Sequence, residues 1–291
     1  MDDDYPGWEV CPTSELVPYD QLFTGEPEIW VDNCQQAFKA EILDRQHDVK
    51  LKDKMPVEYA ENVISANEIY DTLNSKQSAE EKDNVCVEAS DERTDARELY
   101  RNESNEAIIG NYFAKRSKIA FENEPDEAYK FYMQAIDLYY DAYAVSSLKQ
   151  TYKNKTILYA GTCYFNIGQS ENLPIDVREQ AYMFSIALTN EYRTKSKEDT
   201  IALNHTIGTA YMKLCELSDD DSVKYYFNRK AEAEFEKDFA NAGCGKKAKK
   251  AAAEELVYVE QYCYDHIDSS VYINETRNSV SKKHKKYLKM L

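Results

Sequence analysis

Residues that turn a chain are scarce in this sequence, whose 291 residues include only 8 glycines and 7 prolines. An all-β fold built from many short hairpins needs more of them, so the sequence predicts an all-α fold. No apolar run approaches the roughly eighteen residues that a membrane-spanning helix requires. The chain opens with Met1 and three aspartates, without the apolar stretch of a secretory signal. We therefore expect a cytoplasmic location.

Motifs of known chemistry are also missing. The 7 cysteines include no CxxC pair, which argues against a zinc site and is typical of free thiols in a reducing compartment. Cys11 beside Pro12 is at most half of a metal site. No GxSxG, HExxH, GxxxxGK or GxGxxG pattern occurs. We therefore predict a non-enzymatic protein without a metal or cofactor.

Charge is unevenly distributed along the chain. Residues 1–100 carry 25 acidic and 9 basic side chains, whereas residues 246–291 carry 6 and 10. The formal net charge of -17 disfavours general binding to nucleic acid, whose phosphates the chain would repel. The exception is a basic C-terminal tail that includes Lys282, Lys283, Lys285 and Lys286. Such a tail is either a contact for nucleic acid or an anionic membrane surface, or a solvated helix terminus.

The N-terminal third divides into two predicted regions. Residues 1–74 form an acidic region with two helices, one over 28–47 and one beginning at Pro56. The first helix carries an apolar residue at every fourth position, which is the stripe of an amphipathic helix. These residues are Trp30, Cys34, Phe38 and Ile42. Residues 75–103 are charged and poor in large apolar side chains, so they predict an acidic, partly disordered linker.

A pattern of glycine and aromatic residues recurs three times in the following chain. Each glycine is followed by one aromatic residue 3 positions later and by another 19 to 23 positions later. The three sets are Gly110, Phe113 and Tyr132; Gly161, Tyr164 and Phe184; and Gly208, Tyr211 and Phe227. A glycine lets two helices approach closely, and we expect the aromatic residues to fill the gap between one hairpin and the next. The recurrence predicts stacked helical hairpins over residues 104–240.

The predicted hairpins pair 104–123 with a helix from Pro125, 156–167 with 174–192, and 196–217 with 221–239. A last long helix over 246–267 begins with alanines, which form helix readily. Together with the basic tail, this helix makes up a predicted capping region over residues 241–291.

These residues resemble the signature of the tetratricopeptide repeat family. In that family the first helix carries a glycine, two further residues and a tyrosine, and a second glycine follows at the turn. Here the signature reads as Gly161-Thr162-Cys163-Tyr164 with Gly168 and, without the turn glycine, as Gly208-Thr209-Ala210-Tyr211. The second-helix signature reads as Ala128, Tyr132, Ala135 and Ile136. The resemblance covers residues 104–240 and implies an α-solenoid of hairpins that binds other proteins.

The spacing departs from that family. Successive glycines of the pattern lie 51 and 47 residues apart, whereas the family repeats about every 34 residues. Each hairpin must therefore have longer helices or longer turns, as in the tetratricopeptide-like bacterial regulators that respond to peptides. The predicted function is a protein-protein interaction scaffold that serves as an adaptor or a peptide-sensing regulator.

Aligning the three first helices on their glycines gives two polar rows. The row one residue after the glycine holds Asn111, Thr162 and Thr209, and the row five residues after it holds Lys115, Asn166 and Lys213. In the resembled family these positions line a groove that grips a peptide carboxylate. The resemblance thus implies that Asn111, Lys115, Asn166 and Lys213 receive an acidic or C-terminal segment, and the alternative is an ordinary solvated helix face. The acidic N-terminal region is a second candidate occupant, which would make it autoinhibitory.

Two other functions stay open on the sequence alone. One is a nucleic-acid or membrane-surface accessory protein that works through the basic tail, with contacts that weaken steeply as salt rises. The other is a structural subunit of a larger assembly, which exposed rows of tyrosines on the end helices would favour.

Overall fold

The structure of the chain is a computed structural model. It describes residues 22–23, 25–52, 71, 73–76, 78–82, 84, 105–120, 125–144, 150–196, 201–240 and 245–291. Its longer elements are η1 (Pro27–Ile29), α3 (Trp30–Lys52), α6 (Asn105–Ala120), α7 (Pro125–Ala144), α8 (Gln150–Gly168), α9 (Ile175–Lys195), α10 (Ile201–Leu217), α11 (Asp221–Ala240), α12 (Lys246–His266), η3 (Ser269–Val271) and α13 (Arg277–Leu288). Across these residues the chain is helical and has no β-strand, which confirms the predicted all-α class. None of the described helices is both long enough and apolar enough to cross a bilayer.

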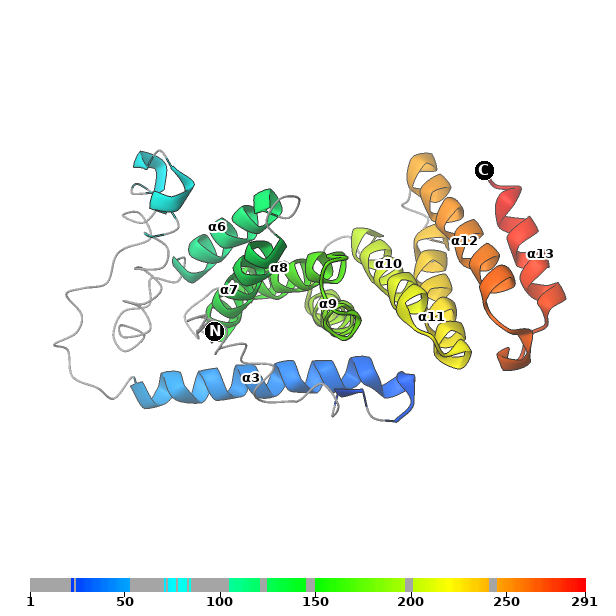
Figure 1. The fold of residues 1–291 in the computed structure, drawn as a ribbon, viewed down its shortest axis with the longest axis horizontal. Coiled ribbons are helices and arrows are strands. Elements are labelled where there is room, and N and C mark those ends of the chain that lie inside the picture. Colours follow the sequence, from blue (N-terminus) through cyan, green and yellow to red (C-terminus); the bar gives the residue numbers. More distant parts are fainter. Residues whose placement is uncertain are drawn as a thin grey trace, which may run out of the picture.

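Consecutive helices pack against each other along the chain. Figure 1 shows α6 to α13 following one another along the long axis of the molecule, while α3 runs lengthwise along one side. The three predicted hairpins are present as α6 with α7, α8 with α9, and α10 with α11. Pro125 opens α7, where its missing N–H has no partner to lose. Asp220 caps α11, because its Oδ1 accepts hydrogen bonds from the backbone N–H of Ser222 (2.8 Å) and Val223 (3.0 Å).

The glycines of the recurring pattern lie where the two helices of a hairpin touch. A Cβ atom added at Gly208 would lie 2.7 Å from the ring of Phe235, and one at Gly110 would lie 3.0 Å from the ring of Tyr139. At Gly161 the nearest atom would be Thr189 Oγ1 at 3.2 Å. The expectation that these glycines permit close helix approach is therefore confirmed.

The aromatic residues of the pattern stack mainly within hairpins. Tyr164 stacks on Phe184 with ring centroids 5.1 Å apart, and Tyr211 stacks on Phe227 at 6.1 Å. The expectation that they fill the gap between hairpins is wrong for these pairs, because both rings belong to one hairpin. In the first hairpin Phe113 stacks on Phe131 at 5.8 Å instead of on Tyr132. One position along a helix turns a side chain by about 100°, so Tyr132 faces the next hairpin.

Residues 277–288 pack as a helix against α12 and form a further helix pair. Val280 and Tyr287 are buried on its inner side, with 0% and 1% of their surfaces exposed. The helix begins with a capping box in which Thr276 and Ser279 exchange hydrogen bonds between side chain and backbone. The C-terminal segment therefore contributes to the core as well as carrying a basic surface.

Helix α3 confirms the predicted N-terminal helix and extends it beyond residue 47. Cys34, Phe38 and Ile42 of the predicted stripe are buried against the hairpins. The helix contacts α7 and α9, the second helices of the first two hairpins. Arg45 Nη1 and Nη2 lie 2.7 Å from Asp141 Oδ1 and 2.5 Å from Asp137 Oδ1, respectively. These contacts join two segments that are far apart in the sequence.

Other predictions for the N-terminal third lie mainly outside the described residues. These are the helix from Pro56 and most of the linker over 75–103. Leu73 is described and packs, partly buried, against the core. The domain boundaries stay predictions.

Candidate functional site

A hollow of about 230 Å³ lies between α6, α7 and α8, and three of the four predicted binding residues line it. Asn111 and Lys115 come from α6, and Asn166 comes from α8. The remaining lining residues are Ala114, Lys118, Tyr132, Tyr139, Tyr159, Thr162 and Cys163. We call this site the α6–α8 hollow. It brings together residues of two hairpins because α7 and α8 pack side by side.

Two tyrosines form the inner part of the α6–α8 hollow. Tyr139 Oη donates a hydrogen bond of 2.8 Å to Asn111 Oδ1, which orients the Asn111 amide. Burial raises the pKa of Tyr139 well above its usual range. Burial also raises the pKa of Tyr132 to about 12, although a hydrogen bond with Asn166 acts in the opposite direction. Both phenols therefore keep their protons at neutral pH and present hydroxyl groups.

Lys213 does not line the hollow. It belongs to α10, the next first helix along the chain, and its Nζ lies 2.7 Å from Glu216 Oε2. Thr209, in the other polar row, donates its hydroxyl to the backbone carbonyl of His205. Lys118 lines the hollow, whereas Lys213 does not. Lys118 stands three residues after Lys115, so the two lie on the same face of one helix, and this spacing was the signal for it in the sequence.

Helix α3 is not among the elements that line the α6–α8 hollow. It meets α7 through Arg45 and Phe38, and it meets α9 through Gln35, whose Nε2 donates a 2.7 Å hydrogen bond to Glu191 Oε2. The described part of the acidic N-terminal region therefore leaves the hollow uncovered. The autoinhibition hypothesis now concerns residues outside the described ranges.

A larger cleft, of about 990 Å³, lies between η1, α11 and the loop that leads into α13. Trp30 and Pro27 form its N-terminal wall, and Tyr225 and Tyr226 belong to α11. Asn274, in the loop, has a positive φ of 60°. We call this site the α11–α13 cleft.

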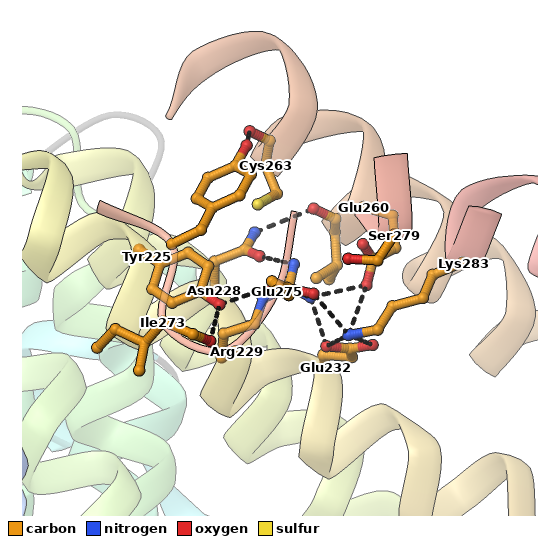
Figure 2. Close-up of polar contacts among 12 residues, drawn as sticks. Tyr225, Asn228, Arg229, Glu232, Glu260, Cys263, Ile273, Glu275, Ser279 and Lys283 are labelled. Carbon is orange, nitrogen blue, oxygen red and sulfur yellow. Dashed lines mark hydrogen bonds and ion pairs between the residues drawn. The ribbon is translucent and has the colours of Figure 1, made fainter. Parts of the chain in front are cut away.

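Five charged residues form a partly buried cluster at the edge of this cleft. We call them the Arg229 cluster, and Figure 2 shows their side chains converging from α11, α12, α13 and the loop between the last two: Arg229, Glu232, Glu260, Glu275 and Lys283. Arg229 Nη1 lies 2.6 Å from Glu232, 2.9 Å from Glu260 and 3.4 Å from Glu275. Lys283 Nζ lies 2.9 Å from Glu232, 3.2 Å from Glu275 and 4.0 Å from Glu260. The cluster therefore places three carboxyl groups around two cations.

Glu260 is the innermost member of the cluster, with none of its side chain exposed. Burial raises the pKa of Glu260 to about 8, and the attraction of Arg229 only partly opposes this. Burial also acts to raise the pKa of Glu232, but Arg229 and Lys283 together lower it. The nearby Glu232 carboxylate also acts to raise the pKa of Glu260. Because the pKa of Glu260 is raised and that of Glu232 is lowered, Glu260 is the carboxyl of the two that holds a proton at neutral pH.

No known protein family, curated protein or solved structure matches this chain. Function must therefore be inferred from the hollow, the cleft and the charged surfaces. In the described part of the chain, no group of three or more Cys, His, Asp or Glu side chains is arranged to hold a metal ion.

The four lysines of the predicted basic tail lie in different environments. Lys283 belongs to the Arg229 cluster, whereas Lys282 and Lys285 are exposed on α13. Lys286 Nζ lies 4.8 Å from the ring centroid of Tyr287. Glu260 is not among the residues predicted from the sequence, although it stands next to Val259 in the buried stripe of α12, between Leu256 and Cys263. A carboxyl group in such a stripe is a signal for a buried charged partner.

Proposed function

We propose that this chain is a non-enzymatic interaction scaffold, built like a tetratricopeptide array, that acts as an adaptor or a peptide-sensing regulator. The observation that carries the proposal is the α6–α8 hollow, where Asn111, Lys115 and Asn166 meet from two hairpins. The same residue types hold peptide carboxylates in the family that the sequence resembles.

The chemistry of the α6–α8 hollow favours a carboxylate ligand. Lys115 and Lys118 supply positive charge, and hydrogen bonds between a cation and a carboxylate are about twice as strong as neutral ones. Asn111 uses its carbonyl oxygen to accept from Tyr139, so its amide N–H groups remain donors for a ligand. Tyr159 is 40% exposed and offers an aromatic face beside these donors. The partner is therefore an acidic segment or the C-terminus of another protein.

A charge reversal in the hollow tests this proposal, and the chain offers a matched control. We would capture partners of the tagged full-length chain from its native host and identify them by mass spectrometry. Lys115→Glu should abolish capture of the partner that binds the α6–α8 hollow. Lys213→Glu changes the equivalent position outside the hollow, so this variant should still capture that partner. A partner captured equally by both variants would refute the hollow as its binding site.

A structural role in a larger assembly is the second candidate, because α12 carries a row of rings on its surface. Tyr258 and Tyr262 have ring centroids 6.2 Å apart, and Tyr262 and His266 have centroids 4.6 Å apart. Tyr258 is 46% exposed. Changing Tyr258 to Ser would dissociate such an assembly in size-exclusion chromatography and leave a carboxylate partner bound.

Binding of nucleic acid or an anionic membrane surface through the basic tail has less support. Lys283 is engaged by Glu232 and Glu275, which leaves fewer lysines for an external anion. Lys115→Glu distinguishes this function from the first, because a contact of the α13 lysines with phosphates should not depend on a lysine that lines the α6–α8 hollow.

A further inference from the structure

The Arg229 cluster joins α13 to the rest of the molecule. Lys283 is the member from α13, Glu275 comes from the preceding loop, and both contact Arg229 or Glu232 of α11. Tyr225 reinforces this junction, because its hydroxyl lies 2.7 Å from Glu275 Oε1 and 3.1 Å from the carbonyl oxygen of Ile273. The docking of α13 thus depends on a few partly buried ionic contacts in addition to Val280 and Tyr287.

The cluster has an excess of negative charge when all its members are ionised. Three carboxylates then face two cations, and Glu260 Oε2 is buried without a hydrogen-bond partner. An unpaired charge away from water is unfavourable, and a group in that position tends to neutralise. One proton on Glu260 leaves two carboxylates facing two cations and so balances the charge of the cluster.

The groups that face Glu260 come from every element around it. They are Arg229 and Glu232 from α11, Lys283 and Tyr287 from α13, Glu275 from the loop, and Cys263 from α12 itself. Tyr287 and Cys263 stay neutral near pH 7, because burial raises the pKa of each above its usual range. Glu260 is therefore the member whose charge changes near neutral pH.

We propose that the Arg229 cluster is a proton-controlled latch for α13. The latch is closed while Glu260 carries its proton, and it loosens when Glu260 is ionised. Release of α13 moves Glu275, Ser279 and Lys283, which line the α11–α13 cleft, so the latch also controls the width of that cleft. This inference does not depend on the α6–α8 hollow or on its ligand.

The direction of the pH effect follows from the raised pKa of Glu260. A carboxyl group whose pKa is higher in the docked state favours docking at low pH, and this contribution is lost as pH rises through the window from 4.5 to about 8. If α13 release returns Glu260 to its ordinary pKa, the opening constant rises by up to roughly fiftyfold between pH 6 and pH 8. We expect at least a tenfold rise, because neighbouring charges relax when the latch opens.

Hydrogen exchange of the full-length chain, measured by mass spectrometry at pH 6 and pH 8, tests the latch. After correction for intrinsic chemical exchange, residues 277–288 should open at least tenfold more often at pH 8. Glu260→Gln keeps the shape of the protonated carboxyl group but cannot ionise, so it should remove this difference. Glu254→Gln, a 56% exposed position on the same helix, should behave as the wild type. Protection that is independent of pH in the wild type, or unchanged pH dependence in Glu260→Gln, would overturn the proposal.

A second measurement covers the case in which Glu260→Gln fails to fold. In the wild-type chain with ¹³C-labelled glutamate, the side-chain carboxyl of Glu260 should titrate near pH 8, well above the ordinary glutamate pKa of 4.5. A spectrum in which every glutamate titrates near its ordinary value would overturn the latch without any variant.

Discussion

The contact between Gly208 and Phe235 predicts the sign of a substitution that helix propensity alone would get wrong. Alanine forms helix better than glycine by about 1 kcal/mol, so Gly208→Ala in the middle of α10 would ordinarily stabilise the chain. Here the new Cβ would lie 2.7, 2.9 and 3.0 Å from three atoms of the Phe235 ring. Phe235 is fully buried and cannot swing away. Overpacking of this kind costs about 1 to 3 kcal/mol. Because the contact with the ring is so close, we expect a cost at the upper end of that range.

The net expectation for Gly208→Ala is a loss of about 1 to 2 kcal/mol in the free energy of unfolding. Urea unfolding followed by circular dichroism measures it as a lower midpoint with an unchanged slope. Phe235→Leu provides the second half of a double-mutant cycle. Alone it should cost about 1 to 2 kcal/mol through the cavity that it leaves, and it should cost much less in the Gly208→Ala background, where the added methyl group already fills that space.

The control for this prediction is Gly245→Ala, where an added Cβ would have no atom within 4 Å. Its effect should be small and should not depend on residue 235. A Gly208→Ala variant as stable as the wild type, together with equal costs of Phe235→Leu in both backgrounds, would refute the reasoning. The two helices of the third hairpin would then not approach at this glycine.

Three more perturbations test other contacts. Arg45→Met removes the cation shared by Glu41, Asp137 and Asp141. It should lower the free energy of unfolding by about 2 to 3 kcal/mol, somewhat less than for a fully buried pair, because Asp137 is 30% exposed. Hydrogen exchange of α3 measures this loss, and Lys39→Met, at a position that is 55% exposed, is the control that should have no effect. The stacked pair Tyr164 and Phe184 should show a coupling of about 0.5 to 1.5 kcal/mol in a cycle of leucine variants, and additive losses would contradict the stack. Val280→Asp should release α13 at any pH, seen as rapid tryptic cleavage after the tail lysines, while Ser281→Asp should leave cleavage slow.

Most of the helices could be predicted from the sequence, because the spacing of apolar residues and the position of a proline act on the helix in which they stand. The four-residue stripe of Cys34, Phe38 and Ile42 faces the core, and Pro125 begins a helix. The glycines at 161 and 208 mark close approach, because an added Cβ would lie 3.2 Å from Thr189 Oγ1 and 2.7 Å from the Phe235 ring, respectively. The packing of α13 was missed because its two buried residues, Val280 and Tyr287, stand among many lysines. Two buried residues among so many charged ones do not give a recognisable apolar pattern in the sequence.

The sequence predicted site residues only where they occupy equivalent positions on the first helices of neighbouring hairpins. Asn111, Lys115 and Asn166 share a hollow because the same register repeats on neighbouring first helices. Lys213 is left out because it belongs to α10, whereas the residues that line the hollow come from α6, α7 and α8. The Arg229 cluster was not predictable from spacing, since Arg229 and Glu260 are 31 residues apart and Glu232 and Lys283 are 51 apart. Only the packing of α11, α12 and α13 brings them together.

The most direct test of the proposed function is a calorimetric titration with the C-terminal peptide of a captured partner. The full-length chain should bind the peptide with a free carboxylate, and it should lose most of that affinity when the peptide is amidated or when Lys115 is changed to Glu. Lys213→Glu should bind as the wild type does. Equal binding of the free and amidated peptides by the wild type and by Lys115→Glu would contradict a carboxylate site in the α6–α8 hollow.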